Sequence, residues 1–226
     1  TPAGQHRPIL VSEILDSLAP QPGQRGADVT LGYGGHSQEI LARLKPGGQL
    51  LALDVDSLQL PRTESRLRGL GYDEDTLIVR RSNYAGLAAM LGKLDWTEGL
   101  DFLLADLGLS SMQIDNPERG FSYKHDGPLD MRMNPERGAP ASQWLGKCTL
   151  KKLTNALTNG GDEPHARDIA RAILATLPIE TTKGLREMVS SAIPPHFDDE
   201  ERSRTIARVF QAIRIAVNEE FTALDS

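Results

Sequence analysis

A glycine-rich turn between a predicted strand and a predicted helix is the first chemical signal in the chain. Residues Asp28–Ser37 read Asp-Val-Thr-Leu-Gly-Tyr-Gly-Gly-His-Ser. Glycines there let the backbone approach a ligand closely, and the helix that follows offers free N–H groups to a carboxylate or a phosphate. The same glycines would also suit a tight turn that binds nothing. The turn therefore leaves two interpretations open, a ligand site and a purely structural turn.

An acidic residue at the end of the next predicted strand favours a ligand that contains ribose. Asp54 follows the glycines by about 20 residues, where a carboxylate can accept hydrogen bonds from the two ribose hydroxyls of an adenosine. The spacing Gly32-x-Gly34-Gly35 departs from the G-x-G-x-x-G pattern of dinucleotide sites, so S-adenosylmethionine fits better than NAD. Asp54 could instead be a solvated charge. Tyr84, after the third predicted strand, could face an adenine or pack in the core.

Strand and helix patterns alternate in the first half of the chain. The predicted strands are Gly26–Thr30, Gln49–Asp54, Thr76–Arg80 and Leu100–Asp106. The predicted helices between them are His36–Leu44, a crossover within Asp56–Gly71 whose first half is weakened by Pro61, and a segment around Tyr84–Leu94. This alternation is typical of an α/β domain with a parallel sheet.

The alternation stops after Asp106. A loop rich in glycine, proline and charge (Asp115–Gly138) precedes amphipathic helices at Leu150–Leu157, Ala166–Leu177 and Thr182–Ile193. Apolar residues from Ile206 to Leu224 then mark one face of a long helix. We predict that residues 1–111 form the first part of the α/β domain, residues 112–203 a helical insertion, and residues 204–226 a helix that returns to the α/β domain.

The fourth predicted strand is apolar enough to belong inside a sheet, yet no later segment supplies a strand to cover its outer side. An open apolar edge invites aggregation. From the usual size of an α/β domain, we expect about 90 residues of the complete domain to be absent from this sequence.

The charge of the chain is unevenly spread. Its net charge is −6, but residues 119–152 carry 7 Lys/Arg against 3 Asp/Glu, a net of +4. Such a basic island can bind phosphates even in an acidic protein, although many charged stretches are only solvated faces. The island therefore leaves nucleic acid open as a partner.

Composition excludes several other classes of protein. The single cysteine, Cys148, rules out a disulfide framework and a multi-cysteine metal site and favours a reducing compartment. No apolar run approaches the roughly 20 residues that span a bilayer, and Thr1–His6 resembles neither a signal nor a transit peptide. We expect no bound metal and no membrane association.

Several longer motifs identify a family. They are the glycine turn and the blocks Asp106–Gln113, Asn116–Tyr123, Asp126–Met133 and Phe210–Asn218. Together they closely resemble the MraW-type family of small-subunit (16S-type) ribosomal RNA cytosine-N4 methyltransferases, which is found in bacteria and organelles. The resemblance runs from about His6 to Leu224, nearly the whole chain.

The resemblance implies a fold, a cofactor and a set of binding residues. The fold is a Rossmann-like class I methyltransferase domain with a helical insertion after the fourth strand. The cofactor is S-adenosylmethionine. The positions that match the family's cofactor contacts are Gly34, Gly35, His36, Asp54, Tyr84, Asp106 and Gln113.

The chemistry expected of such an enzyme explains the turn after the fourth strand. The N4 lone pair of cytosine is delocalised, so the amine needs a hydrogen-bond acceptor and alignment with the methyl donor. Asp106, Ser110 and Ser111 occupy the place where methyltransferases acting on exocyclic amines commonly carry an acidic or amide residue and a short turn. Asp106 could alternatively bind only the cofactor.

The substrate of this family must also leave its base stack. Trp144 is a candidate stacking platform, or else a core residue. The candidate phosphate or RNA contacts are Arg119, Lys124, Asp130, Arg132, Lys147, Lys151 and Lys152. Asp130 and Arg132 could equally form an internal ion pair. The expected partner is small-subunit rRNA or the assembling small subunit, with a homodimer possible, in the bacterial cytoplasm, the chloroplast stroma or the mitochondrial matrix.

Two departures from the family pattern keep a second hypothesis open. The family continues through further strands, including a His-Ser-Leu-Glu-Asp-like block, that this sequence does not contain, and Asp56-Ser57-Leu58 replaces an Asp-Pro-like start. We therefore expect this chain to be C-terminally incomplete, to bind cofactor at least weakly and to turn over poorly. A non-catalytic rRNA-binding or ribosome-assembly factor that keeps the fold is the alternative.

Overall fold

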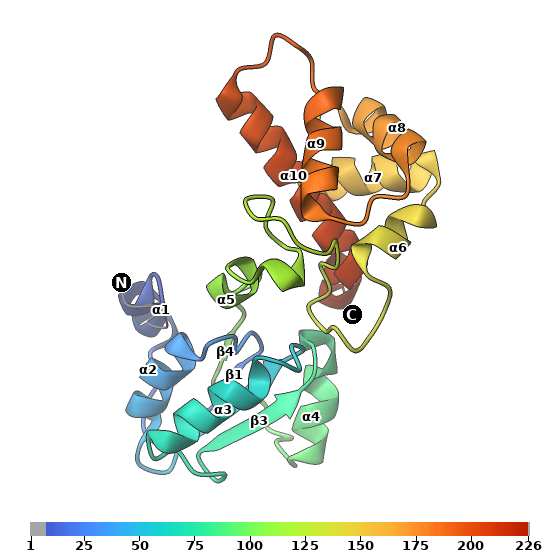
Figure 1. Ribbon diagram of the computed structural model, residues 1–226. Coiled ribbons are helices and arrows are strands. Elements are labelled where there is room, and N and C mark those ends of the chain that lie inside the picture. Colours follow the sequence, from blue (N-terminus) through green and yellow to red (C-terminus); the bar gives the residue numbers. More distant parts are fainter. Residues whose placement is uncertain (1–7, 226) are drawn as a thin grey trace. The chain divides into compact units, whose positions relative to one another are not determined.

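The computed structural model describes residues 8–225, which form two compact units (Figure 1). The first unit contains the chain up to Ser110 together with the end from Ala223, and the second contains Ser111–Thr222. The expectation about Thr1–His6 lies outside the described residues. Within residues 8–225, no helix has both the length and the apolar character needed to cross a membrane.

The first unit is built on a parallel sheet of four strands. These are β1 (Arg25–Asp28), β2 (Gln49–Asp54), β3 (Leu77–Arg81) and β4 (Phe102–Leu104), in the order β3-β2-β1-β4. The order reverses direction between β1 and β4, which makes this place the switch point where doubly wound sheets bind ligands at the carboxyl ends of their strands. The predicted parallel α/β sheet is therefore confirmed.

Two strands are shorter than predicted. β1 ends at Asp28, and just beyond it the N–H of Thr30 donates to the Asp28 carboxylate (3.0 Å). β4 covers only Phe102–Leu104 of the apolar run and lies at one edge of the sheet, where Leu103 is 47 % exposed.

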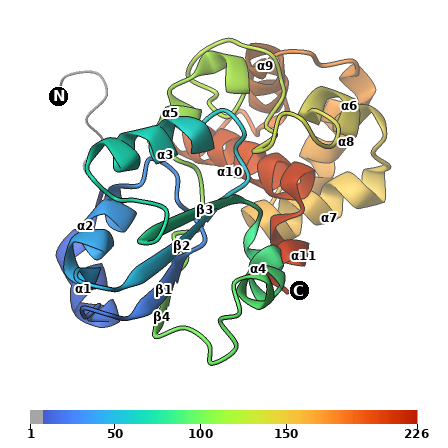
Figure 2. The same ribbon diagram turned by 90° about the horizontal axis from the view of Figure 1, so that it is seen from below.

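Helices cover both faces of the sheet (Figure 2). Helices α1 (Val11–Leu18), α2 (Gly35–Leu44) and α3 (Leu60–Gly69) pack on one face, and α4 (Leu87–Lys93) packs on the other after the 3₁₀ turn Tyr84–Gly86. The side chains of β2 alternate between the two cores, as a strand covered on both faces requires. Leu50 and Ala52 face the first core, and Leu51 and Leu53 face the second.

The crossover helix after β2 begins later than the predicted segment. Pro61 lies in the first turn of α3, where its missing N–H breaks no hydrogen bond and where it does not weaken the helix. The preceding turn is held by the Asp56 carboxylate, which accepts from the N–H groups of Leu58 (2.9 Å) and Gln59 (3.2 Å).

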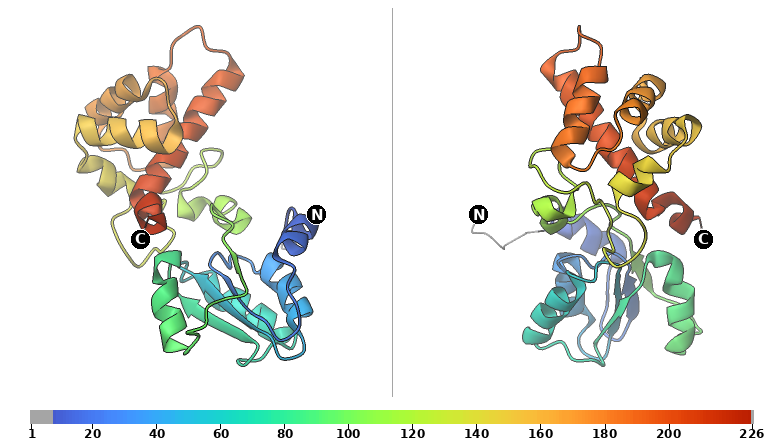
Figure 3. Two further views of the ribbon diagram at one scale, coloured as in Figure 1. Left: turned by 180° about the vertical axis from the view of Figure 1, so that it is seen from behind. Right: turned by 45° about the vertical axis from the view of Figure 1, so that its right-hand side comes forward.

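The second unit is helical. Its elements are α5 (Ser111–Ile114), a 3₁₀ turn (Pro117–Arg119), α6 (Ala141–Gly146), α7 (Leu150–Gly161), α8 (Ala166–Thr176), α9 (Thr182–Ala192) and α10 (Asp199–Asn218). Figure 3 shows the long α10, in red, and helices α6, α7 and α9 pack against it. The predicted helices after Leu150 are confirmed, with small differences at their ends.

The long C-terminal helix begins and ends earlier than its apolar pattern suggested, and it packs within the second unit. A capping box of Asp198 and Glu201 starts α10, and Glu219 in a left-handed conformation (φ 52°) ends it before the short α11 (Glu220–Leu224). The sequence predicted that residues 204–226 return to the α/β domain. In the structure α10 packs against α6, α7 and α9 and belongs to the second unit, because its buried face completes that unit's core.

Helices α7 and α10 approach closely where α7 carries two glycines. Gln211 Nε2 donates to the carbonyl of Gly160 (3.1 Å). A Cβ on Gly160 would lie 3.2 Å from Ala212 Cα, and one on Gly161 would lie 2.5 Å from the carbonyl oxygen of Arg208. The contact therefore has no room for a side chain at Gly161.

We predict that Gly161→Ala destabilises the second unit by about 1–3 kcal/mol, because the new methyl group overlaps the backbone of α10. Gly146, in the last position of α6, is the control, since a Cβ there would meet no atom within 4 Å. Gly146→Ala should be neutral or slightly stabilising. Urea denaturation of both variants measures the difference, and equal stability of the two would contradict the close contact.

Candidate functional site

The Asp54 carboxylate, at the end of β2, holds the glycine turn. Its Oδ2 accepts from the N–H of Gly32 (2.7 Å) and its Oδ1 accepts from the N–H of Asp56 (2.9 Å). Burial raises the pKa of Asp54, while these two backbone donors act in the opposite direction. Each carboxylate oxygen has a second acceptor position, so Asp54 can still accept from two further donors such as adjacent hydroxyls.

The glycine turn needs its glycines for two separate reasons. Gly32 (φ 49°) and Gly34 (φ 76°) both have left-handed backbones, which favour glycine. A Cβ on Gly34 would also lie 2.8 Å from Cγ2 of Thr63, whose hydroxyl donates to the carbonyl of Gly32 (2.6 Å). Gly34, the N-cap residue of α2, has no side chain that could cap the helix, and the first N–H groups of a helix can bind an anionic ligand.

A second carboxylate lies beneath the turn at the end of β1. Asp28 is 1 % exposed and accepts from the Ser37 hydroxyl (2.6 Å), the Thr30 N–H (3.0 Å) and the Thr30 hydroxyl (3.2 Å). Burial raises the pKa of Asp28, and the hydrogen bonds from the three donors lower it by a smaller amount. Asp28 was not among the site residues predicted from the sequence, although an acid at the end of a buried strand, followed by threonine and serine, is a recognisable signal.

Asp106 and His36 lie close together at the same end of the sheet. The Asp106 side chain is 60 % exposed, and its Oδ2 lies 3.8 Å from His36 Nδ1. His36 Nε2 lies 2.9 Å from the carbonyl oxygen of Ile9, which orients the ring. The first unit therefore brings together the predicted residues Gly34, Gly35, His36, Asp54 and Asp106.

The remaining predicted catalytic and cofactor-binding residues do not all lie with these five. A Cβ on Gly32 would lie 3.8 Å from Ser110 Cβ, so Ser110 lies beside the glycine turn. Tyr84 packs partly buried on the core formed by Val29, Leu53 and their neighbours, and its contact with the cofactor stays a prediction. Ser111 and the buried Gln113 belong to the second unit, and their roles stay predictions.

Two buried polar atoms near Asp54 have no hydrogen-bond partner in the described part of the chain. They are Oγ of Ser57 and Oε1 of Gln59, and Gln59 is 6 % exposed. Gln59 precedes Thr63 by one helical turn on the side of α3 that touches the glycine turn. Unsatisfied buried acceptors are costly, and they are expected where a ligand completes the hydrogen bonding. Neither residue was predicted from the sequence.

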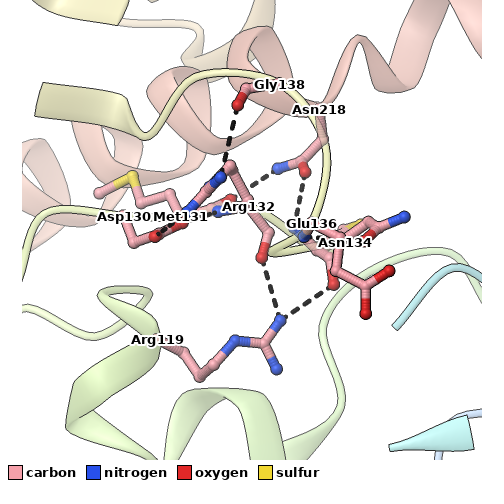
Figure 4. Close-up of polar contacts among 9 residues, drawn as sticks. Arg119, Asp130, Met131, Arg132, Asn134, Glu136, Gly138 and Asn218 are labelled. Carbon is pink, nitrogen blue, oxygen red and sulfur yellow. Dashed lines mark hydrogen bonds and ion pairs between the residues drawn. The ribbon is translucent and has the colours of Figure 1, made fainter. Parts of the chain in front are cut away.

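In the second unit, Arg119 stabilises a loop instead of presenting a charge (Figure 4). It is 7 % exposed, and one guanidinium nitrogen donates to the carbonyls of Arg132 (3.0 Å) and Met133 (2.9 Å). An arginine so placed cannot reach a phosphate while the loop stays folded. The structure therefore does not support the predicted RNA contact of Arg119.

The same loop contains the internal ion pair that was the alternative for Asp130 and Arg132. The carboxylate of Asp130 accepts from Arg132 Nε (2.8 Å) and from its terminal nitrogen (2.7 Å). Asn218, at the end of α10, accepts from the N–H of Met133 (2.7 Å) and donates to the carbonyl of Met131 (2.8 Å). These bonds hold the buried Met131 in a left-handed conformation (φ 61°). The role of Asn218 was missed, although the motif that contains it was recognised.

The remaining predicted RNA residues are more accessible. Lys124, Lys147, Lys151 and Lys152 are exposed. Trp144 on α6 is half-buried, and the ammonium of Lys152 lies 5.3 Å from its ring centroid. This cation–π pair keeps a positive charge beside an aromatic face, an arrangement that suits a stacked base and its phosphate.

A parallel sheet of order β3-β2-β1-β4, with a glycine turn after β1 and an acid at the end of β2, defines a Rossmann-like domain of the class I methyltransferase type. Residues 3–226 match the model of the MraW methylase family. The chain belongs to this family, which confirms the resemblance inferred from its motifs.

Bacterial relatives share much of the sequence. Ribosomal RNA small subunit methyltransferase H 2 of Alkaliphilus metalliredigens is 46 % identical over 231 residues, covering 99 % of this chain and 65 % of that protein. Ribosomal RNA small subunit methyltransferase H 1 of Lachnoclostridium phytofermentans is 44 % identical over 234 residues, covering 100 % of this chain and 63 % of that protein. The chain thus spans about two thirds of the length of these curated relatives.

We predict that Asp28→Asn changes the stability of the first unit in a pH-dependent way. Because burial raises the folded-state pKa of Asp28, its carboxyl group stabilises the fold most below its unfolded pKa, and this contribution is lost as pH rises through the raised pKa. The asparagine of the variant does not titrate, so its contribution does not change with pH. As pH rises, the free energy of unfolding of wild type should therefore fall relative to that of Asp28→Asn, by about 1.4 kcal/mol per unit of difference between the folded and unfolded pKa. Urea denaturation across the acidic to neutral range measures it. A difference between the two proteins that is constant with pH would contradict the assignment.

Proposed function

We propose that the protein transfers a methyl group from S-adenosylmethionine to the N4 amine of a cytidine in small-subunit ribosomal RNA. The observation that carries this proposal is the Asp54 carboxylate beside the glycine turn, in a chain of the MraW methylase family. The relatives' names, which specify ribosomal RNA of the small subunit, support the substrate class.

The residues at the strand ends fit S-adenosylmethionine. Asp54 would accept from the two ribose hydroxyls, and the uncapped start of α2 after Gly34 and Gly35 would receive the carboxylate of the methionine part. The unsatisfied oxygens of Ser57 and Gln59 offer further acceptors for the nucleoside. When bound, S-adenosylmethionine supplies an electrophilic methyl group on its sulfonium.

Asp106 is the candidate that acts on the amine. Its carboxylate is exposed at the end of the sheet, and its Oδ2 lies 3.8 Å from Nδ1 of His36. By accepting a hydrogen bond from the N4 amine, Asp106 would localise the nitrogen lone pair and hold the amine in line for attack on the methyl group. Ser110 and Ser111 would position the base through their hydroxyls.

The second unit would bind the RNA. The target base must leave its stack, and Trp144 offers an aromatic face for it or for a neighbour. Lys124, Lys147, Lys151 and Lys152 would contact phosphates, whereas Asp130 and Arg132 would act by fixing the loop. Gln113 and Tyr84 remain proposed cofactor contacts. The assembling small subunit in the bacterial cytoplasm, or its organellar equivalent, is the proposed setting.

Asp54→Ala should weaken S-adenosylmethionine binding by about 1–3 kcal/mol, the scale for leaving hydroxyl partners unpaired. The exposed Asp75, on the turn before β3, is the control, and Asp75→Ala should bind as wild type does. Isothermal titration calorimetry gives both affinities. If Asp54→Ala binds like wild type, Asp54 is not part of the cofactor site.

Charge reversal at Lys151 and Lys152 should weaken RNA binding and flatten its salt dependence, while cofactor affinity stays unchanged, because two phosphate contacts are lost. The same reversal at Arg43 and Lys93, exposed near the ends of α2 and α4, controls for the change in net charge. Filter binding to small-subunit rRNA at several salt concentrations measures the slopes. Equal slopes for both double variants would identify the basic island as a solvated face.

Mass spectrometry of small-subunit rRNA from cells with and without the gene tests the proposed activity itself. We expect one N4-methylated cytidine to disappear on deletion and to return with the wild-type gene but not with Asp54→Ala. An unchanged set of modified nucleotides refutes the reaction. RNA binding without that methylation would favour a non-catalytic role.

A further inference from the structure

One side chain links the ends of the first and fourth strands. The hydroxyl of Thr30 accepts from the N–H of Asp106 (2.8 Å) and donates to Oδ1 of Asp28 (3.2 Å). The backbone pairing between these segments ends just before, with the N–H of Val29 donating to the carbonyl of Leu104 (3.0 Å). The threonine hydroxyl therefore extends the link between β1 and β4 as far as Asp106.

The direction of these hydrogen bonds is fixed by chemistry. A backbone N–H can only donate, so the Thr30 hydroxyl must accept from Asp106 and is left to give its own proton to Asp28. Asp28 is buried and also accepts from the Thr30 N–H and the Ser37 hydroxyl, so it cannot move without breaking three hydrogen bonds. Asp28 thereby fixes the orientation of the hydroxyl that holds Asp106.

Asp106 depends on this bond because little else restrains it. Its side chain is 60 % exposed and has only the 3.8 Å approach of His36 among the described residues. The chain leaves the sheet at this point, and Gly108 follows with a left-handed φ of 149° and no atom within 4 Å of an added Cβ. A backbone restraint at Asp106 is thus what would set the place of its carboxylate.

We propose that Thr30, oriented by Asp28, is a positioning residue for Asp106 in the cofactor-binding end of the sheet. The role rests on the proposed function, since it requires that Asp106 contacts S-adenosylmethionine. Thr30 itself touches neither ligand nor substrate in this account and acts only through the N–H that it accepts.

A double-mutant cycle tests this role. Thr30→Val keeps the shape of the side chain and removes the hydroxyl, and it should lower S-adenosylmethionine affinity about tenfold, the scale of one lost hydrogen bond. On an Asp106→Ala background the same change should alter affinity by less than about twofold, because residues that act through each other are not additive. Thr30→Ser should restore most of the wild-type affinity.

Two controls separate positioning from general damage. Ser37→Ala removes a different donor from the same Asp28 carboxylate but leaves the Thr30–Asp106 hydrogen bond in place, so its coupling to Asp106→Ala should be smaller than that of Thr30→Val. Hydrogen exchange of the Asp106 amide, followed by NMR without ligand, should accelerate more in Thr30→Val than in Ser37→Ala.

The outcomes distinguish this role from the proposed function. Additive effects of Thr30→Val and Asp106→Ala, or an unchanged Asp106 exchange rate in Thr30→Val, overturn the positioning role even when wild type binds S-adenosylmethionine. Failure of wild type to bind S-adenosylmethionine refutes the proposed function instead, and the positioning role falls with it whatever the exchange rates are.

Discussion

A carboxyl group buried at the end of β1 determines the arrangement of the strand ends. An unpaired carboxylate in the interior would be strongly unfavourable, so Asp28 requires donors, and it obtains them from Ser37 on α2 and from Thr30. These bonds fix where α2 starts relative to β1. Asp54 holds the opposite side of the same turn through the N–H of Gly32. The glycine turn is thus held between two carboxylates, and its shape follows from their positions.

In the second unit, too, charged side chains hold a loop in place through hydrogen bonds. Arg119 and the Asp130–Arg132 pair lie in a region with excess positive charge, yet each satisfies groups inside its own loop. Asn218 completes this network from the end of α10. Within the basic island, by contrast, the side chains of Lys124, Lys147 and Lys152 are exposed.

Local patterns in the sequence predicted the elements of the fold well. The strands alternate with helices as expected, and the amphipathic pattern of α7–α9 was found because each buries one face. The assignment of α10 to the α/β domain failed, because an apolar stripe shows that a helix is buried but not against which unit. The expectation that Pro61 weakens the crossover helix was wrong, because a proline in the first turn of a helix breaks no hydrogen bond and the start of α3 could not be located from the sequence.

The candidate site was predictable where spacing along the chain carries the chemistry. Gly34, Asp54 and Asp106 could be identified because each follows directly from a strand end. Thr30 and Asn218 could not, because their importance depends on partners 76 and 87 residues away, and Gln59 could not, because its importance depends on burial. Arg119 illustrates the opposite case. Its place in a basic segment suggested a phosphate contact, but the sequence does not show that its guanidinium group is buried and hydrogen-bonded within its own loop.

The central claim is that S-adenosylmethionine binds at the carboxyl ends of β1, β2 and β4, and mapping amide shifts tests it most directly. In a ¹⁵N-labelled sample, addition of S-adenosylmethionine should shift the amides of Gly32, Gly34, Gly35 and Asp106 most strongly. The helices of the second unit from α7 to α9 should change little. Shifts concentrated on those helices, or no saturable shifts at all, would contradict the account.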